Sequence, residues 1–154
     1  MDTFSTHTAP RRQDPALQRL LDLAEIQQLH FDYGRHLDAG DFDAFADLFA
    51  EDAELLLGPG MRAAGRTAIR DMMAKRLRDR VGKVFHLITS PAVQLDGDSA
   101  TAEVMWVVAG EDPSQPGRVV LNGLGRHRDE LKREEGRWVI SRRRSYQDLP
   151  THPH

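Results

Sequence analysis

The hydrophobic period of the chain changes near Val84, and this change constrains the fold more than any other feature. Before it, apolar residues recur at the spacing of amphipathic helices. After it, apolar and polar residues alternate, as in strands, over four segments longer than an average strand: residues 85–95, 100–109, 118–131 and 137–146. Helices followed by strands predict an α+β domain, in which a broad, curved antiparallel sheet curls over N-terminal helices.

Residues 22–49 predict a long amphipathic helix and a short helix that meet at a tight corner. Asp22 and Glu25 have the spacing of a capping box, so we expect a bent junction at Asp22 with a preceding helix that starts at residues 14–15. Gly40 is expected to cap the long helix in a left-handed conformation, and Asp41 to cap the short one. The buried stripe of the long helix combines apolar side chains with an imidazole and a phenol: Ile26, Leu29, His30, Tyr33 and Leu37.

The segment between the short helix and Val84 predicts a strand at residues 53–57, a loop and a third helix at residues 67–80. The glycine-rich loop at residues 58–66 lacks the lysine and hydroxyl pair of a phosphate-binding loop, so we interpret it as a connector. The third helix has a basic outer face that we expect to be solvated, formed by Arg70, Lys75, Arg76 and Arg78.

The length of 154 residues fits one ordinary domain with a single core. Residues 1–13 are polar and without periodicity, and they predict a flexible N-terminal arm. We expect the domain at residues 14–148 and a C-terminal tail at residues 149–154.

Charge and cysteine content restrict the partners and the compartment. The net charge of -3 gives no field that would attract nucleic acid or an anionic membrane surface, so neither is expected as a partner. The absence of cysteine fits a reducing compartment, and the apolar runs are too short to span a bilayer. We therefore expect a cytoplasmic protein.

Tyr33, Asp38 and His86 are the residues for which we predict a catalytic role. His86 opens the first long strand and shares a face with Ile88, which places a titratable imidazole among apolar neighbours. Asp38 lies in the last turn of the long helix, where the helix dipole disfavours a negative charge and an adjacent histidine would compensate. Such a pair is an oriented general base, because the carboxylate fixes the tautomer. Tyr33 and Asp38 are about 140° apart on an ideal helix, so sharing one pocket predicts a distortion near Gly40.

Five further residues are candidates for contacts with a substrate. His30 would line the pocket floor one turn before Tyr33, and His36 lies at the edge of the apolar stripe. The strands add an aromatic surface, an amide and a guanidinium that would project to the pocket mouth: Trp106, Asn122 and Arg144. No set of histidines and carboxylates has the spacing of metal ligands, so we predict no metal and no other cofactor.

Four segments carry a family pattern: YGRHLDAGDFDAFADLFAEDAEL, GRTAIRDMM, VFHLITSPAVQLDGDSATAEVMWVV and GLGRHRDELKREEGRWVISRRR. With the order of elements, they make residues 20–146 resemble the SnoaL-like branch of the nuclear transport factor 2-like superfamily. The resemblance implies a cone made of a curved antiparallel sheet over helices, with a deep and largely apolar pocket inside.

The resemblance also extends to single residues. Bile acid dehydratases of this superfamily use a tyrosine, an aspartate five residues later and a histidine at the start of a strand, and Tyr33, Asp38 and His86 match them in type and place. Scytalone dehydratase has the same aspartate and histidine. It adds a histidine on a later strand, for which the sequence near Trp106 offers no match. The base of ketosteroid isomerase would fall at residues 55–57, which are all leucine.

The resemblance implies a cofactor-independent lyase, such as a dehydratase, acting on a small and mostly apolar aromatic or polycyclic substrate. The alternatives are a lyase that releases formaldehyde from lignin-derived diaryl compounds, an isomerase or cyclase, and a non-catalytic binding or assembly subunit. We also expect a homo-oligomer, a dimer or trimer, because the open sheet face would expose apolar residues such as Val119 and Leu121.

Overall fold

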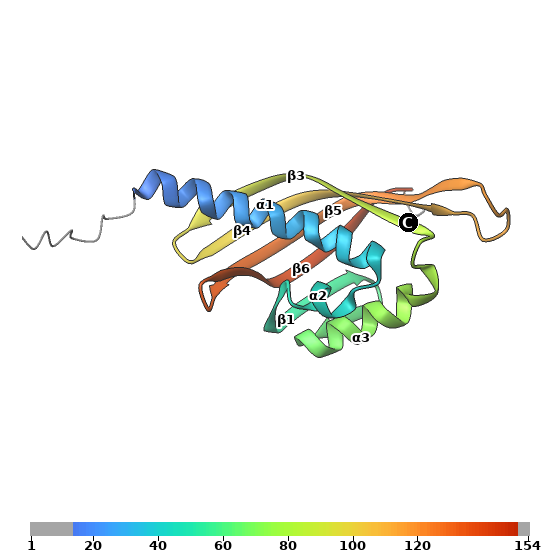
Figure 1. The fold of residues 1–154 in the computed structure, drawn as a ribbon, viewed down its shortest axis with the longest axis horizontal. Helices are drawn as coiled ribbons and strands as arrows, with labels where there is room; N and C mark the ends of the chain where they lie inside the picture. The colour runs from blue at the N-terminus through green and yellow to red at the C-terminus, as the bar shows by residue number, and fades with distance from the viewer. Residues whose placement is uncertain (1–13, 151–154) are drawn as a thin grey trace, which may run out of the picture.

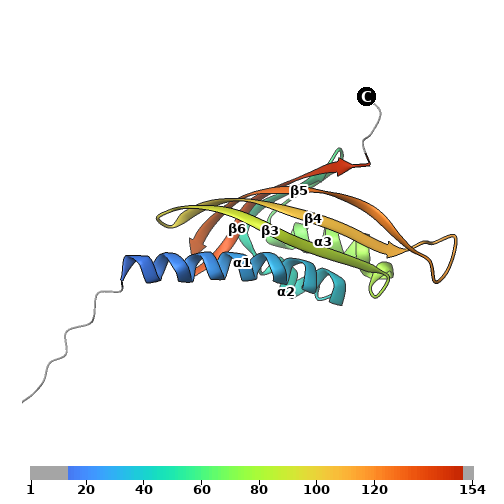
Figure 2. The same cartoon turned by 90° about the horizontal axis from the view of Figure 1, so that it is seen from above.

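The computed structural model describes residues 14–150, which form three helices, a short 3-10 helix and one six-stranded sheet (Figure 1). The strand order is β2-β1-β6-β5-β4-β3, and every neighbouring pair is antiparallel except the parallel pair β1–β6. The sheet is curved and unclosed, and the helices lie under one of its faces (Figure 2). The elements are α1 (Pro15–Ala39), α2 (Phe42–Ala46), β1 (Phe49–Gly58), β2 (Met61–Ala64), α3 (Arg66–Leu77), η1 (Arg78–Arg80), β3 (Val84–Asp96), β4 (Ser99–Glu111), β5 (Val119–Glu134) and β6 (Arg137–Leu149).

The predicted α+β architecture is confirmed. The sheet has two more strands than the alternation indicated, because β1 and the short β2 extend it beyond the four long strands. β2 lies within the glycine-rich segment that the sequence suggested was a plain connector. The predicted arm at residues 1–13 lies outside the described residues, and β6 reaches Leu149, the first residue of the predicted tail.

Helix α1 is a single helix of 25 residues, so the predicted bend at Asp22 is wrong. Its N-cap is Asp14, whose side chain accepts from the backbone N–H of Ala16. Asp22 and Glu25 do not form a capping box, because both carboxylates bind the β5–β6 hairpin. Asp22 accepts from Arg133 and from the Trp138 indole at 3.2 Å, and Glu25 accepts from the Trp138 backbone N–H at 2.8 Å. The acidic spacing therefore marks a helix-to-sheet contact.

The corner after α1 has the predicted form. Gly40 has a φ of 71°, a left-handed conformation that glycine adopts without steric cost, and its N–H binds the Leu37 carbonyl. Asp41 then accepts from the Ala44 N–H at 3.0 Å and caps α2. The corner sets α2 against α1 and α3, and its Phe45 is completely buried.

The core fills the space between the helices and the concave face of the sheet. Its fully buried members come from both layers: Ile26, Phe45, Phe49, Leu55, Ile69, Val104, Val139 and Ile140. The opposite face of the sheet leaves apolar side chains exposed at β3, β4 and β5: Phe85, Leu87, Met105, Val119 and Leu121. This second set is called the outer apolar face below.

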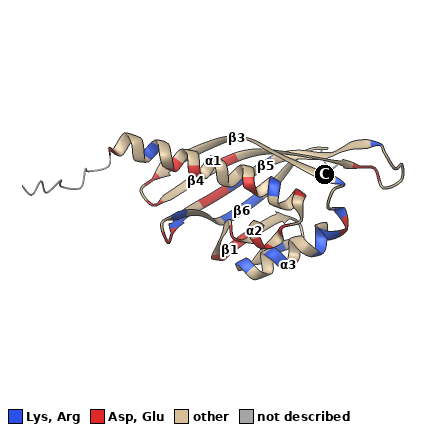
Figure 3. Ribbon diagram, viewed as in Figure 1, with Lys and Arg blue, Asp and Glu red and all other residues tan. Residues whose placement is uncertain are grey.

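Helix α3 carries the predicted basic surface, visible as blue segments in Figure 3. Arg70 pairs with Asp43 at 3.3 Å and with Asp71 at 2.9 Å, as expected for solvated side chains. Arg76 is exposed, as expected, but it also lines the cavity described below.

A β-bulge in β6 changes which of its arginines face the core. Ile140 pairs with Leu131, but Arg142 already pairs with Glu130, so Ser141 is an extra residue in the ladder. An extra residue reverses the alternation of side chains beyond it. Arg143 consequently points inward and is completely buried, whereas Arg144 is exposed on the other face.

Candidate active site

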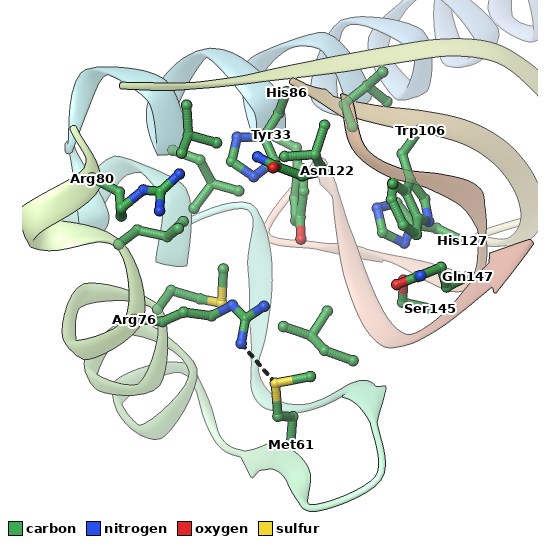
Figure 4. A pocket seen from close by; sticks show the side chains of 18 of the residues that line it. Tyr33, Met61, Arg76, Arg80, His86, Trp106, Asn122, His127, Ser145 and Gln147 are labelled. Atoms are coloured by element: carbon green, nitrogen blue, oxygen red, sulfur yellow. Dashed lines mark hydrogen bonds between the residues drawn. The ribbon is translucent and has the colours of Figure 1, made fainter. Parts of the chain in front are cut away.

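A cavity of about 590 Å³ lies between the concave face of the sheet and helices α1 and α3. This volume is in the usual range for small-molecule sites. Much of its wall is apolar: Leu37, Leu57, Met73, Leu77, Val84, Ile88 and Val108. Polar side chains project into it from several elements: Tyr33, Arg76, Arg80, His86, Asn122, His127, Ser145 and Gln147 (Figure 4).

His86 is held by Asp38 from behind the cavity wall. The Nδ1 atom of His86 lies 2.6 Å from Oδ1 of Asp38. The two carboxylate oxygens also accept from the backbone N–H of His86, at 3.1 and 3.0 Å. A carboxylate that binds both the backbone and the ring of one histidine fixes the position and the rotamer of that histidine.

This arrangement requires no distortion of α1. Tyr33 lines the cavity, whereas Asp38 contacts the back of His86 and is not part of the lining. The predicted irregularity near Gly40 is therefore unnecessary, and α1 continues to Ala39. Close approach of the helix to β3 makes the contact possible, since a Cβ on Gly34 would lie 2.7 Å from the His86 carbonyl oxygen.

The geometry determines which nitrogen of His86 is free to react. The carboxylate of Asp38 only accepts hydrogen bonds, so it selects the tautomer with the proton on Nδ1. Nε2 then carries the lone pair, on a ring that lines the cavity. Asp38 also compensates any positive charge that forms on the ring, which is the arrangement of a general base.

Tyr33 is a buried phenol in an aromatic and cationic environment. It is only 3% exposed, its ring lies 5.0 Å from that of Phe45, and the Arg143 guanidinium lies 4.1 Å from its centroid. Burial raises the pKa of Tyr33, and the Arg143 charge offsets only part of that effect. Tyr33 is consequently a hydrogen-bond donor throughout the neutral range.

His127 lines the same cavity and was missed by the sequence analysis. Its ring lies between Tyr33, at 5.6 Å, and Trp106, at 5.9 Å. Burial, with a contribution from the Arg143 charge, lowers the pKa of His127 well below its ordinary value, so the ring is neutral. Within residues 14–150, His127 Nδ1 and Trp106 Nε1 have no hydrogen-bond partner. The alternation of β5 could have identified His127. It places His127 on the same sheet face as the buried Leu131, whereas Arg128 is exposed on the other face.

His30 lies outside the cavity, whose floor it was predicted to line. It is fully buried and lies outside the cavity lining. Its Nδ1 lies 2.7 Å from the Ile26 carbonyl and its Nε2 lies 2.8 Å from Asp129. Asp129 also accepts two hydrogen bonds from Arg143, at 2.8 and 2.6 Å. Burial alone would raise the pKa of Asp129, but Arg143 and His30 hold it well below its usual range.

Two of the other predicted contact residues lie on the cavity and two do not. Trp106 and Asn122 are part of its wall. His36 is half-buried on α1 and does not contribute to the lining, because its position lies off the buried stripe. Arg144 projects from the opposite face of the sheet, where the bulge at Ser141 places it near Tyr146 and away from the cavity. Over the described part of the chain, no group of three or more histidines and carboxylates is arranged to hold a metal ion.

Comparison with known families assigns residues 18–144 to a model described as a SnoaL-like domain. The chain belongs to this SnoaL-like family. The match covers all three helices except the first turn of α1, together with most of the sheet. Comparison with curated proteins gave no significant match.

Solved structures confirm the fold expected for this SnoaL-like chain. An NTF2-like protein with a cystatin-like fold from Novosphingobium aromaticivorans is 27% identical, with a TM-score of 0.81 and 88% of each chain covered. A protein of unknown function from Mycobacterium tuberculosis is 27% identical, with a TM-score of 0.78, covering 88% of this chain and 76% of that one. A scytalone dehydratase-like protein from N. aromaticivorans is 20% identical, with a TM-score of 0.77, covering 90% and 93%; at this identity the likeness shows the fold alone.

Proposed function

We propose that this SnoaL-like protein is a cofactor-independent lyase that removes a proton and eliminates a leaving group from a small, mostly apolar molecule. The observation that supports it best is the His86–Asp38 pair, 2.6 Å apart, with His86 on the wall of an apolar cavity. Elimination is also the reaction named for the scytalone dehydratase-like neighbour, whose fold the chain shares. Dehydration is the leading case.

In the proposed reaction, Nε2 of His86 takes a proton from a carbon activated by a neighbouring carbonyl or phenol-conjugated group. The electron pair of that C–H bond forms a double bond as the C–O bond to the hydroxyl breaks, and the hydroxyl leaves as water with a proton from Tyr33 or from the His86 imidazolium; where Tyr33 is the donor, the imidazolium returns a proton to it. Asp38 stabilises the imidazolium in the transition state. A positioned general base of this kind accelerates a reaction by about 10²- to 10⁴-fold.

Two neutral donors are placed to assist the oxygen that gains charge. Tyr33 keeps its proton because of its burial, so it hydrogen-bonds a developing oxyanion or protonates the leaving group. His127 is neutral and its Nδ1 has no partner within the described residues, so it is available to the substrate in the same cavity. We assign it to orientation of the substrate, beside Trp106.

Two alternatives receive less support. An isomerase of the ketosteroid type needs a general base on β1, but the β1 residue in the cavity wall is Leu57. A purely structural assembly subunit is expected to have a filled core, whereas this chain holds a cavity of about 590 Å³ with an oriented histidine.

We further propose that the protein is a homo-oligomer joined through its outer apolar face. Val119 is 75% exposed, and Phe85 and Leu121 are each 61% exposed, which is unusual for side chains that cluster on one sheet.

No helix within residues 14–150 is long and apolar enough to cross a membrane.

The experiment is a ligand screen followed by a turnover assay. Aromatic, terpenoid and polyketide-like compounds are ranked by thermal shift, and the hits are incubated with protein in D₂O in the presence of a chelator. Loss of water from a hit, or exchange of its acidic C–H for deuterium, supports the proposal. Tyr33→Phe should lower the rate with little change in binding, because its hydrogen bond strengthens in the transition state. Hits that bind without exchange or turnover would favour a binding module instead.

A further inference from the structure

Two arginines from one helical segment enter the cavity. Arg76 lies in the last turn of α3 and Arg80 ends η1, four residues later, and both side chains are part of the cavity wall. In Figure 4 their guanidinium groups point toward the interior, on the α3 side of His86, while Trp106 and His127 lie on the other side. The cavity therefore has a cationic end and an aromatic end, with His86 between them.

No carboxylate of the described residues neutralises either guanidinium. Among the ion pairs formed by residues 14–150, none includes Arg76 or Arg80, and no aspartate or glutamate is part of the cavity wall. Arg76 donates to the sulfur of Met61 at 2.9 Å, and a thioether is a weak acceptor. Nε of Arg80 is buried without any hydrogen-bond partner in the described region.

Within the described residues Arg78, in the same segment, also has no carboxylate partner, but its side chain is exposed and lies outside the cavity wall. Arg66 and Arg70, on the same helix, lie within 4.0 Å of carboxylates. Leaving the half-buried Arg80 guanidinium unpaired has a desolvation cost that the exposed Arg76 and Arg78 avoid. An unpaired guanidinium of this kind is explained if its partner is an anionic ligand. The planar guanidinium carries parallel N–H donors that match the two oxygens of a carboxylate.

We infer that the ligand of this cavity is a carboxylic acid, whose carboxylate is bound by Arg80 inside the cavity and by Arg76 at its rim, with its apolar body toward Trp106. The preference for an anion is a binding property and stands without turnover. If the bound acid is also the substrate, the substrate class is aromatic or alicyclic hydroxy acids whose reacting carbon lies between the carboxylate and the ring. This second step rests on the proposed function.

The test compares matched acids and amides. Naphthalene-2-carboxylate and naphthalene-2-carboxamide have nearly the same shape, and only the acid carries a charge at neutral pH. Dissociation constants of this pair, and of the corresponding phenylpropanoate and phenylpropanamide, are measured by calorimetry at fixed salt. The wild-type protein should bind each acid at least about tenfold more tightly than its amide, as expected when hydrogen bonds to a charged group are added.

Variants then locate the preference. Arg80→Gln should abolish most of it, and Arg76→Gln should reduce it by a few fold, because Arg76 is more exposed and its charge is screened. Arg78→Gln is the matched control: it removes an exposed arginine from the same segment, outside the cavity lining, and should leave the preference unchanged. Arg80→Lys should keep part of the preference. Arg80→Gln should not lower the melting temperature, since the Arg80 side chain has no hydrogen-bond or ion-pair partner among residues 14–150.

Three outcomes would overturn the inference. One is equal binding of acid and amide, or no binding of any pair, in the wild-type protein. The second is a preference that Arg80→Gln and Arg78→Gln change equally. The third is tight binding of 2-naphthyl phosphate without binding of the carboxylate, which would assign the site to phosphate. Repeating the assay with His86→Gln separates the two proposals, because that variant should keep the acid preference even if no turnover is ever found.

Discussion

Replacement of Asp129 by asparagine should destabilise the protein severely, because it leaves a buried arginine without its counter-charge. Asp129 and Arg143 are both completely buried and are joined by two hydrogen bonds, of 2.8 and 2.6 Å. Asp129 also binds His30 at 2.8 Å. Asparagine has one acceptor oxygen in place of two and no charge, so it cannot satisfy both partners.

The expected cost follows from burial. Breaking a buried ion pair by removing one partner typically costs about 3–5 kcal/mol, out of a total stability of about 5–15 kcal/mol for a domain. The variant should therefore unfold at a much lower urea concentration, measured by circular dichroism. If its fold is lost entirely, the expectation is met in its strongest form.

Asp148→Asn provides the matched control. Asp148 makes the same two-bond contact with an arginine, Arg126, at 2.9 and 2.9 Å, but the side chains are 37% and 40% exposed. Exposed pairs contribute about 0–1 kcal/mol, because water and salt screen the charges. An Asp129→Asn variant that costs no more than Asp148→Asn would refute the interpretation that burial makes this pair essential.

Three further predictions test other parts of the account. The fold lowers the pKa of His127 below the ordinary histidine value of 6.5. As the pH falls below 6.5, His127 therefore takes up a proton in the unfolded chain but not in the native chain. Stability should then decrease below pH 6.5 by up to about 1.4 kcal/mol per pH unit, and His127→Gln should flatten this slope in urea titrations; an unchanged slope would contradict it. Gly34→Ala should destabilise the protein by about 1–3 kcal/mol in the same assay, although alanine normally favours a helix, because its Cβ would lie 2.7 Å from the His86 carbonyl oxygen. Leu121→Glu, on the outer apolar face, should convert the proposed oligomer to a monomer by light scattering, and a wild-type protein of monomer mass at micromolar concentration would rule the oligomer out.

The sequence predicted the architecture because local patterns and global fold agree along most of the chain. The change of period at Val84, the left-handed Gly40 and the Asp41 cap are all local signals, and each is found where expected. The prediction failed at Asp22 and Glu25, whose spacing is that of a helix cap. A capping box and a pair of helix-to-sheet anchors have the same spacing, and only the position of Trp138 in space distinguishes them.

Site residues could be predicted where a local sequence pattern fixes the direction of the side chain. They could not be predicted where strand register or a distant partner fixes it. Tyr33, Trp106, Asn122 and His86 line the cavity as predicted, and Asp38 binds His86. Arg144 was assigned to the wrong face because a single extra residue, Ser141, reverses the alternation of β6. His30 was assigned to the cavity, but its real partner is 99 residues away in sequence. Such long-range pairs leave no local pattern.

The central claim, that His86 is the general base, is tested most directly by the turnover of His86→Gln on a substrate found in the screen. His36→Gln is the matched control, since His36 lies on the same helix as Asp38 but outside the cavity lining. The account predicts that His86→Gln stays folded and loses about 10²- to 10⁴-fold in kcat, that Asp38→Asn loses less, by about tenfold, and that His36→Gln is unaffected. A folded His86→Gln variant with nearly full activity would show that His86 is a structural histidine and that the base lies elsewhere.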